Sequence, residues 1–273
     1  MAIASERGKL IFRKMERDLR RISRDLHPDS VHAFRTTSLR LQTLLEELLP
    51  ERNRSQKKLL ALLTRIRRKA GKVRDIDVQL AALRSLKTGQ EPRRKTQLTQ
   101  GLIELRGKHE KKLGKLLKKN EVRDIEKRLR KLAKDCDFKA VHDPLVLARK
   151  IVESVANSGA TPDELVLHRY RLTVKRARYA AELASPSRES AQLIAQLKKL
   201  QDALGHWHDW LMLTHTAIDR LGEVNHSSLV AALQNVTRGK LRQAIASLPT
   251  RPPTQPARVA SGTLPAPNAQ FAA

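Results

Sequence analysis

Two stretches of this 273-residue sequence recur, in the same order, in its second half. The segment VHAFRTTSLRLQTLLEEL (31–48) aligns with LHRYRLTVKRARYAAEL (167–183) at an offset of 136. The segment LLTRIRRKAGKVRDIDV (62–78) aligns with AQLKKLQDALGHWHDWLM (195–212) at an offset of 134. Two blocks in one order at nearly one offset are unlikely by chance, so we predict a duplicated chain whose halves are related by a pseudo-two-fold axis.

Helical periodicity is frequent along the chain, whereas strand signals are weak almost everywhere. The sequence therefore predicts an all-α protein, a duplicated helical bundle with about four long helices in each half. The expected helices cover 5–26, 31–49, 53–87, 93–119, 121–136, 144–158, 163–185, 188–222 and 226–247. Proline residues at 50, 92, 144, 186 and 249 fall where these helices should begin or end.

The bundle is expected to form a single domain over 5–248, with halves at 5–119 and 121–248. The final segment, 249–273, is rich in Pro and Ala and has no periodicity, so we expect it to be disordered. The sole cysteine, Cys136, excludes an intramolecular disulfide and fits a reducing compartment. No apolar run reaches the roughly 18 residues that span a bilayer, and the start lacks a signal-peptide core. These features predict a soluble cytoplasmic protein without membrane contact.

The composition is strongly basic, with 55 Lys and Arg against 28 Asp and Glu, a formal net charge of +27. That excess is larger than solubility requires and indicates a polyanionic partner or an acidic surface. Within the second copy of the first block, His168, Arg171, Lys175 and Arg178 share a helix face within an arc of about 80°. Like charges at this spacing repel, so we expect this face to bind an anion.

The first copy repeats this face only in part. His32 and Arg35 match His168 and Arg171, but Leu39 and Gln42 stand where the second copy has Lys175 and Arg178. We therefore expect the second-half helix to be the stronger phosphate-binding face. For one such helix alone, a solvated basic face with a histidine at the core edge is the competing interpretation. The apolar rear of each helix should pack in the core, so that the two basic sides can converge on one groove.

The second block and the basic segment 93–134 supply further candidates, each of which could also be an ordinary surface charge. Asp209 after His208, and Asp75 after Arg74, could form surface salt bridges or orient their neighbours. Gly71 and Gly205 could allow another helix to approach closely. The candidate anion-binding residues are His32, Arg35, Arg40, Arg67, Lys72, Arg74, Arg106, His168, Arg171, Lys175, Arg176, Arg178, Lys198, Lys199 and His208.

Catalysis and metal binding find little support in the sequence. Among nine histidines no pair has the i,i+4 spacing of a helical zinc site, and H-E-x-x-H is absent. A Gly-rich phosphate loop and a G-x-S-x-G motif are also absent. We expect a protein that is not an enzyme and has no cofactor, although a metal site assembled from distant segments stays open.

The two His-x-x-Arg helices, the VKRARY continuation, and the blocks LGHWHD (204–209) and AGKVRD (70–75) resemble the CHAD family, the conserved-histidine α-helical domain. The resemblance covers about residues 5 to 248. It implies a duplicated bundle of long helices with a basic central groove or cavity that binds inorganic polyphosphate, and localisation to polyphosphate granules. Leu39 and Gln42 depart from the usual Arg-rich first motif of the family. Nothing resembles the triphosphatase domain that some relatives carry.

A nucleic-acid-binding protein is the alternative, because DNA and RNA also present phosphates. With 4 Phe, 2 Trp and 2 Tyr, the chain has few aromatic platforms on which single-stranded bases could stack. A phosphohydrolase is a third hypothesis. The oligomeric state, the preferred polyphosphate length, and the choice between a closed pore and an open groove stay open.

Overall fold

The computed structural model describes residues 5–49, 53–87, 91–136, 138, 142–156, 163–221 and 227–248. All regular secondary structure within these residues is helical, which confirms the predicted all-α class. The helices are α1 (Ser5–Arg24), α2 (Pro28–Thr43), the π-helical turn η1 (Leu44–Leu48), α3 (Arg54–Ser85), α4 (Pro92–Gly114), α5 (Lys119–Asp135), α6 (Pro144–Ala156), α7 (Glu164–Ala181), α8 (Arg188–Leu221) and α9 (Ser228–Ala246). The predicted tail, 249–273, lies outside the described residues.

Local sequence signals explain most helix starts. Helices α2, α4 and α6 each begin at a proline, whose fixed φ suits the first turn and whose missing N–H has no partner there. Helix α3 begins with a capping box, in which Asn53 and Gln56 each bond the other's backbone N–H. Asp163 caps α7 by accepting a hydrogen bond from the backbone N–H of Val166 at 2.7 Å.

The end of α2 departs from the expected regular helix. In η1 the N–H of Leu49 donates to the carbonyl of Leu44 at 3.2 Å, which is the i→i+5 bond of a π turn. A π turn accommodates one extra residue within a helix. Side chains after Leu44 are therefore rotated relative to their positions in an uninterrupted α-helix.

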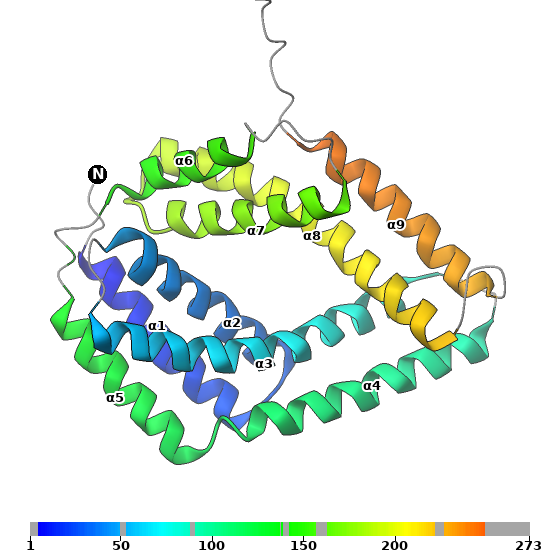
Figure 1. Ribbon diagram of the computed structural model, residues 1–273, viewed down its shortest axis with the longest axis horizontal. Coiled ribbons are helices and arrows are strands. Elements are labelled where there is room, and N and C mark those ends of the chain that lie inside the picture. The colour runs from blue at the N-terminus through cyan, green and yellow to red at the C-terminus, as the bar shows by residue number, and fades with distance from the viewer. Residues whose placement is uncertain are drawn as a thin grey trace, which may run out of the picture.

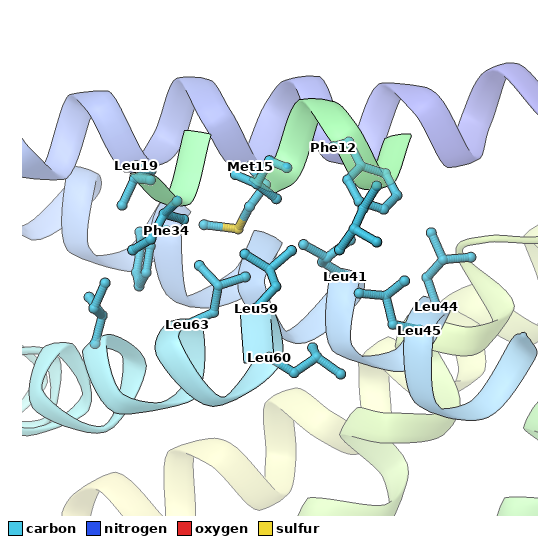
Figure 2. Close-up of a cluster of buried hydrophobic side chains, with 14 of the residues drawn as sticks. Phe12, Met15, Leu19, Phe34, Leu41, Leu44, Leu45, Leu59, Leu60 and Leu63 are labelled. Carbon is cyan, nitrogen blue, oxygen red and sulfur yellow. The ribbon is translucent and has the colours of Figure 1, made fainter. Parts of the chain in front are cut away.

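The first hydrophobic cluster holds α1, α2, α3 and α5 together. Figure 2 shows Phe12 and Met15 of α1 facing Phe34 of α2 and Leu59 and Leu63 of α3. All five side chains are almost fully buried. Fully burying a side chain of this size stabilises the fold by about 1.5–3 kcal/mol, so this cluster fixes α2 and α3 relative to each other.

Two further clusters complete the core. One joins α6, α7 and α8 around Leu167, Leu204 and Trp207. The other contains the second part of α3 and α4 together with α8 and α9, and includes Leu83 and Leu229. Because this last cluster takes side chains from both parts of the chain, the two parts share a core.

The helices recur at the spacing of the sequence repeat. Helices α2 and α7 begin at Pro28 and Glu164, and their starts differ by the offset that aligns the first repeated block. Helices α3 and α8, which begin at Arg54 and Arg188, differ in the same way by the offset of the second block. Helix α5 has no counterpart in that series and packs on α1 and α3 (Figure 1). The predicted division at residues 119–121 therefore assigns α5 to the second half, whereas the helices that it contacts, α1 and α3, belong to the first half. The pseudo-two-fold axis stays a prediction.

Candidate anion-binding site

Four helices that carry the repeated blocks meet at the centre of the molecule. Helix α2 contacts α7, and α3 contacts α8 (Figure 1). Two adjoining cavities, of about 580 and 690 Å³, lie among these helices. The residues that line both are Arg35, Leu39, Asp75, Arg171, Lys175 and Tyr179. The two cavities therefore meet at one central set of side chains, three of which are basic.

Many of the predicted residues converge here. The first cavity extends toward α1 and α8, and the second toward the end of α2 and the middle of α3. Predicted residues that line the first cavity are His32, Arg35, Arg40, Arg74, Arg171, Lys175 and Arg178. Those that line the second are Arg35, Arg67, Arg171, Lys175, Arg176 and His208. Leu39, the first-half counterpart of Lys175, lines both cavities and leaves α2 apolar at that point.

Arg35 crosses from α2 to the surface of α3. Its Nη1 donates to the carbonyl oxygen of Arg67 at 3.3 Å. A Cβ atom at Gly71 would lie only 2.3 Å from that nitrogen, so the glycine makes room for the guanidinium. A Cβ atom at its counterpart Gly205 would meet nothing within 4 Å, and thus only the first copy uses its glycine in this way.

The centre of the site is electrostatically unbalanced. Burial, together with the charges of Arg171 and Arg35, lowers the pKa of Lys175 to about 8. Burial also lowers the pKa of Arg35, an effect that Asp75 opposes. Asp75 faces the open volume of both cavities, yet the packed helices reduce its hydration and raise its pKa despite the nearby cations. One carboxylate among three basic groups leaves positive potential where the cavities meet.

Two histidines whose rings are in tilted contact flank this centre. The rings of His168 and His208 are 5.2 Å apart between centroids. His208 lines the second cavity, whereas His168 lines neither cavity. Burial and the charge of Arg171 lower the pKa of His208 to about 4, so it is neutral at pH 7. Its Nδ1 is buried and has no hydrogen-bond partner among the described residues.

Ion pairs between α2 and α7 order several of the arginines. Arg40 Nε donates to Glu182 Oε2 at 2.7 Å, and Arg178 Nε lies 3.4 Å from the other carboxylate oxygen. Arg40 and Arg178 also lie over the ring of Tyr179, at 5.7 and 5.4 Å from its centroid.

A matching pair runs in the opposite direction, from Arg176 of α7 to Glu47 at 2.5 Å. Arg40 and Arg176, expected either to reach a neighbouring groove or to be surface charges, both line a cavity and form ion pairs.

Four predicted residues do not line these two cavities, in addition to His168. Arg106 instead braces α4 against α3: its Nε donates to Asp77 at 2.5 Å, and Nη2 donates to the carbonyl of Leu26 at 2.9 Å. Lys198 is exposed and pairs with Asp202 at 2.8 Å. Lys199 is exposed on the same helix, and Lys72 lines another cavity, along α3.

Several lining residues were not among the predicted ones. Lys14 reaches the first cavity from α1, a helix with no assigned site residue, and Gln201 presents a buried Oε1 that has no hydrogen-bond partner among the described residues. Arg68 lines the second cavity beside the predicted Arg67. Tyr179 is the aromatic residue that ends the VKRARY segment, and its place directly after Arg178 could have identified it. Nothing in the local sequence around Lys14 indicated that α1 approaches the site.

The described residues hold no group of three or more His, Cys, Asp or Glu side chains that could bind a metal ion. In the same part of the chain, no helix combines the length and apolar character needed to cross a membrane.

Known proteins share this arrangement of helices. The fold is similar to the CHAD domain from the plant Ricinus communis, with a TM-score of 0.61 and 18% identity over 90% of this chain and 88% of that one. It is also similar to PptA from Streptomyces chartreusis, with a TM-score of 0.63 and 15% identity over 90% of this chain and 96% of that one. No curated protein matches the sequence significantly. The family model of the CHAD domain matches residues 8–218, and the chain therefore belongs to the CHAD domain family.

Proposed function

We propose that this protein binds inorganic polyphosphate, without catalysis, in the two adjoining cavities between α2, α3, α7 and α8. The observation that carries the proposal is the central set itself, where Arg35, Arg171 and Lys175 face both cavities and Asp75 is the acidic residue shared by both. The CHAD family is linked to polyphosphate, which agrees with this chemistry.

A linear polyanion suits this geometry for two reasons. Arginine guanidinium groups offer paired donors that match phosphate oxygens, and Lys175 adds a compact charge. The cations are also spread over two connected cavities rather than gathered around one small pocket. Each contact with a phosphate releases a counterion, so affinity should fall steeply with salt.

The first test removes three cations of α7. Reversing the charge at Arg171, Lys175 and Arg178 together should weaken binding of long-chain polyphosphate by orders of magnitude, measured by calorimetry or fluorescence anisotropy. A matched control reverses Arg123, Lys127 and Lys131, which are exposed on α5. If the charge-reversed protein does not fold, Arg171, Lys175 and Arg178 are changed to Gln instead. A folded α7 variant that bound as tightly as the parent would contradict the site.

Nucleic acid is the competing ligand. Tyr179 is the aromatic residue that lines the cavities besides the histidines, and it is buried beneath Arg40 and Arg178. Single-stranded nucleic acid gains much of its affinity from stacking on aromatic rings, which this site offers poorly. Polyphosphate should therefore displace single-stranded DNA at equal phosphate concentration, and failure to do so would favour nucleic acid as the ligand.

Absence of catalysis is tested separately. Prolonged incubation of the protein with polyphosphate and Mg²⁺ or Mn²⁺ should release no orthophosphate. Release that depends on Asp75 or Asp209 would make the protein a phosphohydrolase.

We also propose that polyphosphate binding directs the protein to cytoplasmic polyphosphate granules. A fluorescent fusion should co-localise with the granules in cells that accumulate polyphosphate. The α7 triple variant should be diffuse in the same cells, and its retention on granules would contradict the proposal.

A further inference from the structure

The outer face of α3 carries a row of cations beyond the two central cavities. A cavity of about 760 Å³ lies along this face. We call its five basic lining residues the α3 track: Lys57, Arg65, Arg68, Lys69 and Lys72. From Lys57 to Lys72 the helix rises about 22 Å, so the track is long enough to contact many groups of an extended ligand.

The α3 track is continuous with the central site. Arg68 lines both the second cavity and the track cavity, as do Gln42 and Glu46. A ligand that fills the second cavity can therefore pass Arg68 and reach the track without crossing a separate surface. At the far end, Lys69 and Lys72 lie near His109 of α4. Burial lowers the pKa of His109, and the charges of Lys72 and Lys69 add to that effect.

The cations of the track have no acidic partner among the described residues. Within the described residues, none of the five forms an ion pair, and all except the half-buried Lys69 are exposed. Like charges three or four residues apart on a helix repel one another and reduce its stability. This cost is offset when a polyanion lies along the row.

The two acids near the junction are already engaged. Gln42 Nε2 donates to Glu46 Oε2 at 2.7 Å, and Arg176 pairs with Glu47 at 2.5 Å. They reduce the positive potential at the junction, but the five cations of the track outnumber them.

The track is a property of one half of the molecule. In the alignment that pairs Gly71 with Gly205, its five positions correspond in α8 to Ala191, Lys199, Asp202, Ala203 and His206. Only one of these is a lysine, and one is an acid. The row on α3 is therefore not inherited from the repeat that built the central site.

We propose that the α3 track is an exit path, along which a long polyphosphate chain continues after it leaves the second cavity past Arg68. This inference rests on the proposed function. It adds the direction in which the polyphosphate chain leaves the site, and it makes affinity depend on the length of that chain. Short polyphosphates occupy the central cavities alone. Long ones gain further contacts along α3, on one side of the molecule only.

The test neutralises the track without touching the central cavities. In the full chain, Arg65, Lys69 and Lys72 are changed to Ala, and Arg68 is kept because it lines the second cavity. The control changes Arg123, Lys127 and Lys131 of α5 to Ala, which removes the same charge from another exposed helix. Binding of tripolyphosphate, of long-chain polyphosphate and of single-stranded DNA is measured over a range of salt concentrations.

The track variant should bind tripolyphosphate as the parent does but lose about tenfold or more in affinity for long-chain polyphosphate at low salt. The slope of its log affinity against log salt should fall by about 2–3, one for each lost contact. The control should retain both values. Equal loss in variant and control, or no loss in either, overturns the exit path while leaving the central site intact. If the track variant loses only DNA binding, the track binds nucleic acid and the exit path is wrong. If the parent protein binds neither tripolyphosphate nor long-chain polyphosphate, the proposed function itself is contradicted.

Discussion

Arg40 and Glu182 join the two basic helices of the site through a hydrogen bond of 2.7 Å between Nε and Oε2. The bond connects α2 to the residue that follows α7, from one half of the sequence to the other. The same carboxylate lies 3.4 Å from Arg178, so one glutamate orients an arginine from each helix. The cations of the cavity are thus held in place before any ligand arrives.

The first prediction concerns that carboxylate. Glu182→Gln should lower the free energy of unfolding by about 1–3 kcal/mol, because a charge-assisted bond between half-buried groups is lost. Affinity for polyphosphate should not fall, since a negative charge beside the cavity arginines Arg40 and Arg178 is removed. Urea denaturation measures the first effect and calorimetry the second. Asp202→Asn, which breaks the exposed pair with Lys198, should change stability by less than about 1 kcal/mol. A Glu182→Gln protein as stable as the parent would contradict the role of the bond.

The second prediction separates binding from stability at Gly71. An alanine Cβ there would lie 2.3 Å from Arg35 Nη1, the far end of a flexible side chain that can swing away. Gly71→Ala should therefore weaken polyphosphate binding. It should not destabilise the fold, because alanine favours the helix by about 1 kcal/mol. Gly239→Ala in α9, where nothing lies within 4 Å, should gain stability with unchanged affinity. Equal affinities for the two variants would show that the position of Arg35 is unimportant.

The third prediction is a pH dependence of binding. Because the pKa of Lys175 is about 8 in the free protein, its charge is complete well below pH 8 and lost above it. A bound polyanion favours the charged form, so binding above pH 8 must take up a proton. Affinity should therefore fall as the pH rises from 8 to 9.5, measured at constant ionic strength. Lys175→Arg, which stays charged, should flatten the profile. Parallel profiles for the two proteins would contradict this assignment.

The fourth prediction concerns acid stability. The pKa of His208 is lowered from 6.5 to about 4 in the folded protein. Between these values the unfolded chain binds more protons than the folded one, so the stability contributed by neutral His208 is lost as the pH falls from 6.5 to 4. His208→Gln should make the free energy of unfolding less dependent on pH in this window, measured by urea denaturation. His142→Gln, at an exposed position, is the matched control.

Helix periodicity and the internal repeat were sufficient to predict the all-α class and many of the basic residues that converge. His32, Arg35, Arg171 and Lys175 could be predicted because a helix has a fixed angular period and its apolar side must face the core. Their helices need only pack by those apolar sides for the basic sides to approach one another.

Whether a basic side chain lines a cavity also depends on its contacts with other helices, which the sequence does not reveal. Arg106 lies in a basic stretch that suggested a groove-facing side, but Asp77 of α3 binds it instead. Lys198 belongs to a repeated block, yet its side chain is exposed and pairs with Asp202. Lys14 reaches the first cavity through the packing of α1, which no periodicity within α1 could reveal. Each case depends on how two helices are oriented about their axes, a property of tertiary packing.

The π turn η1 changes how the two halves can be compared. The repeat aligns Glu46 with Glu182, but the residue that pairs with Arg176 is Glu47, whereas Glu182 itself pairs with Arg40. One extra residue within the turn shifts every later side chain by one position, so the neighbouring glutamate takes the place opposite α7. Beyond Leu44, residues that match in the repeat alignment therefore do not make matching contacts. Substitutions transferred from one half to the other by sequence alignment alone would therefore alter the wrong glutamate.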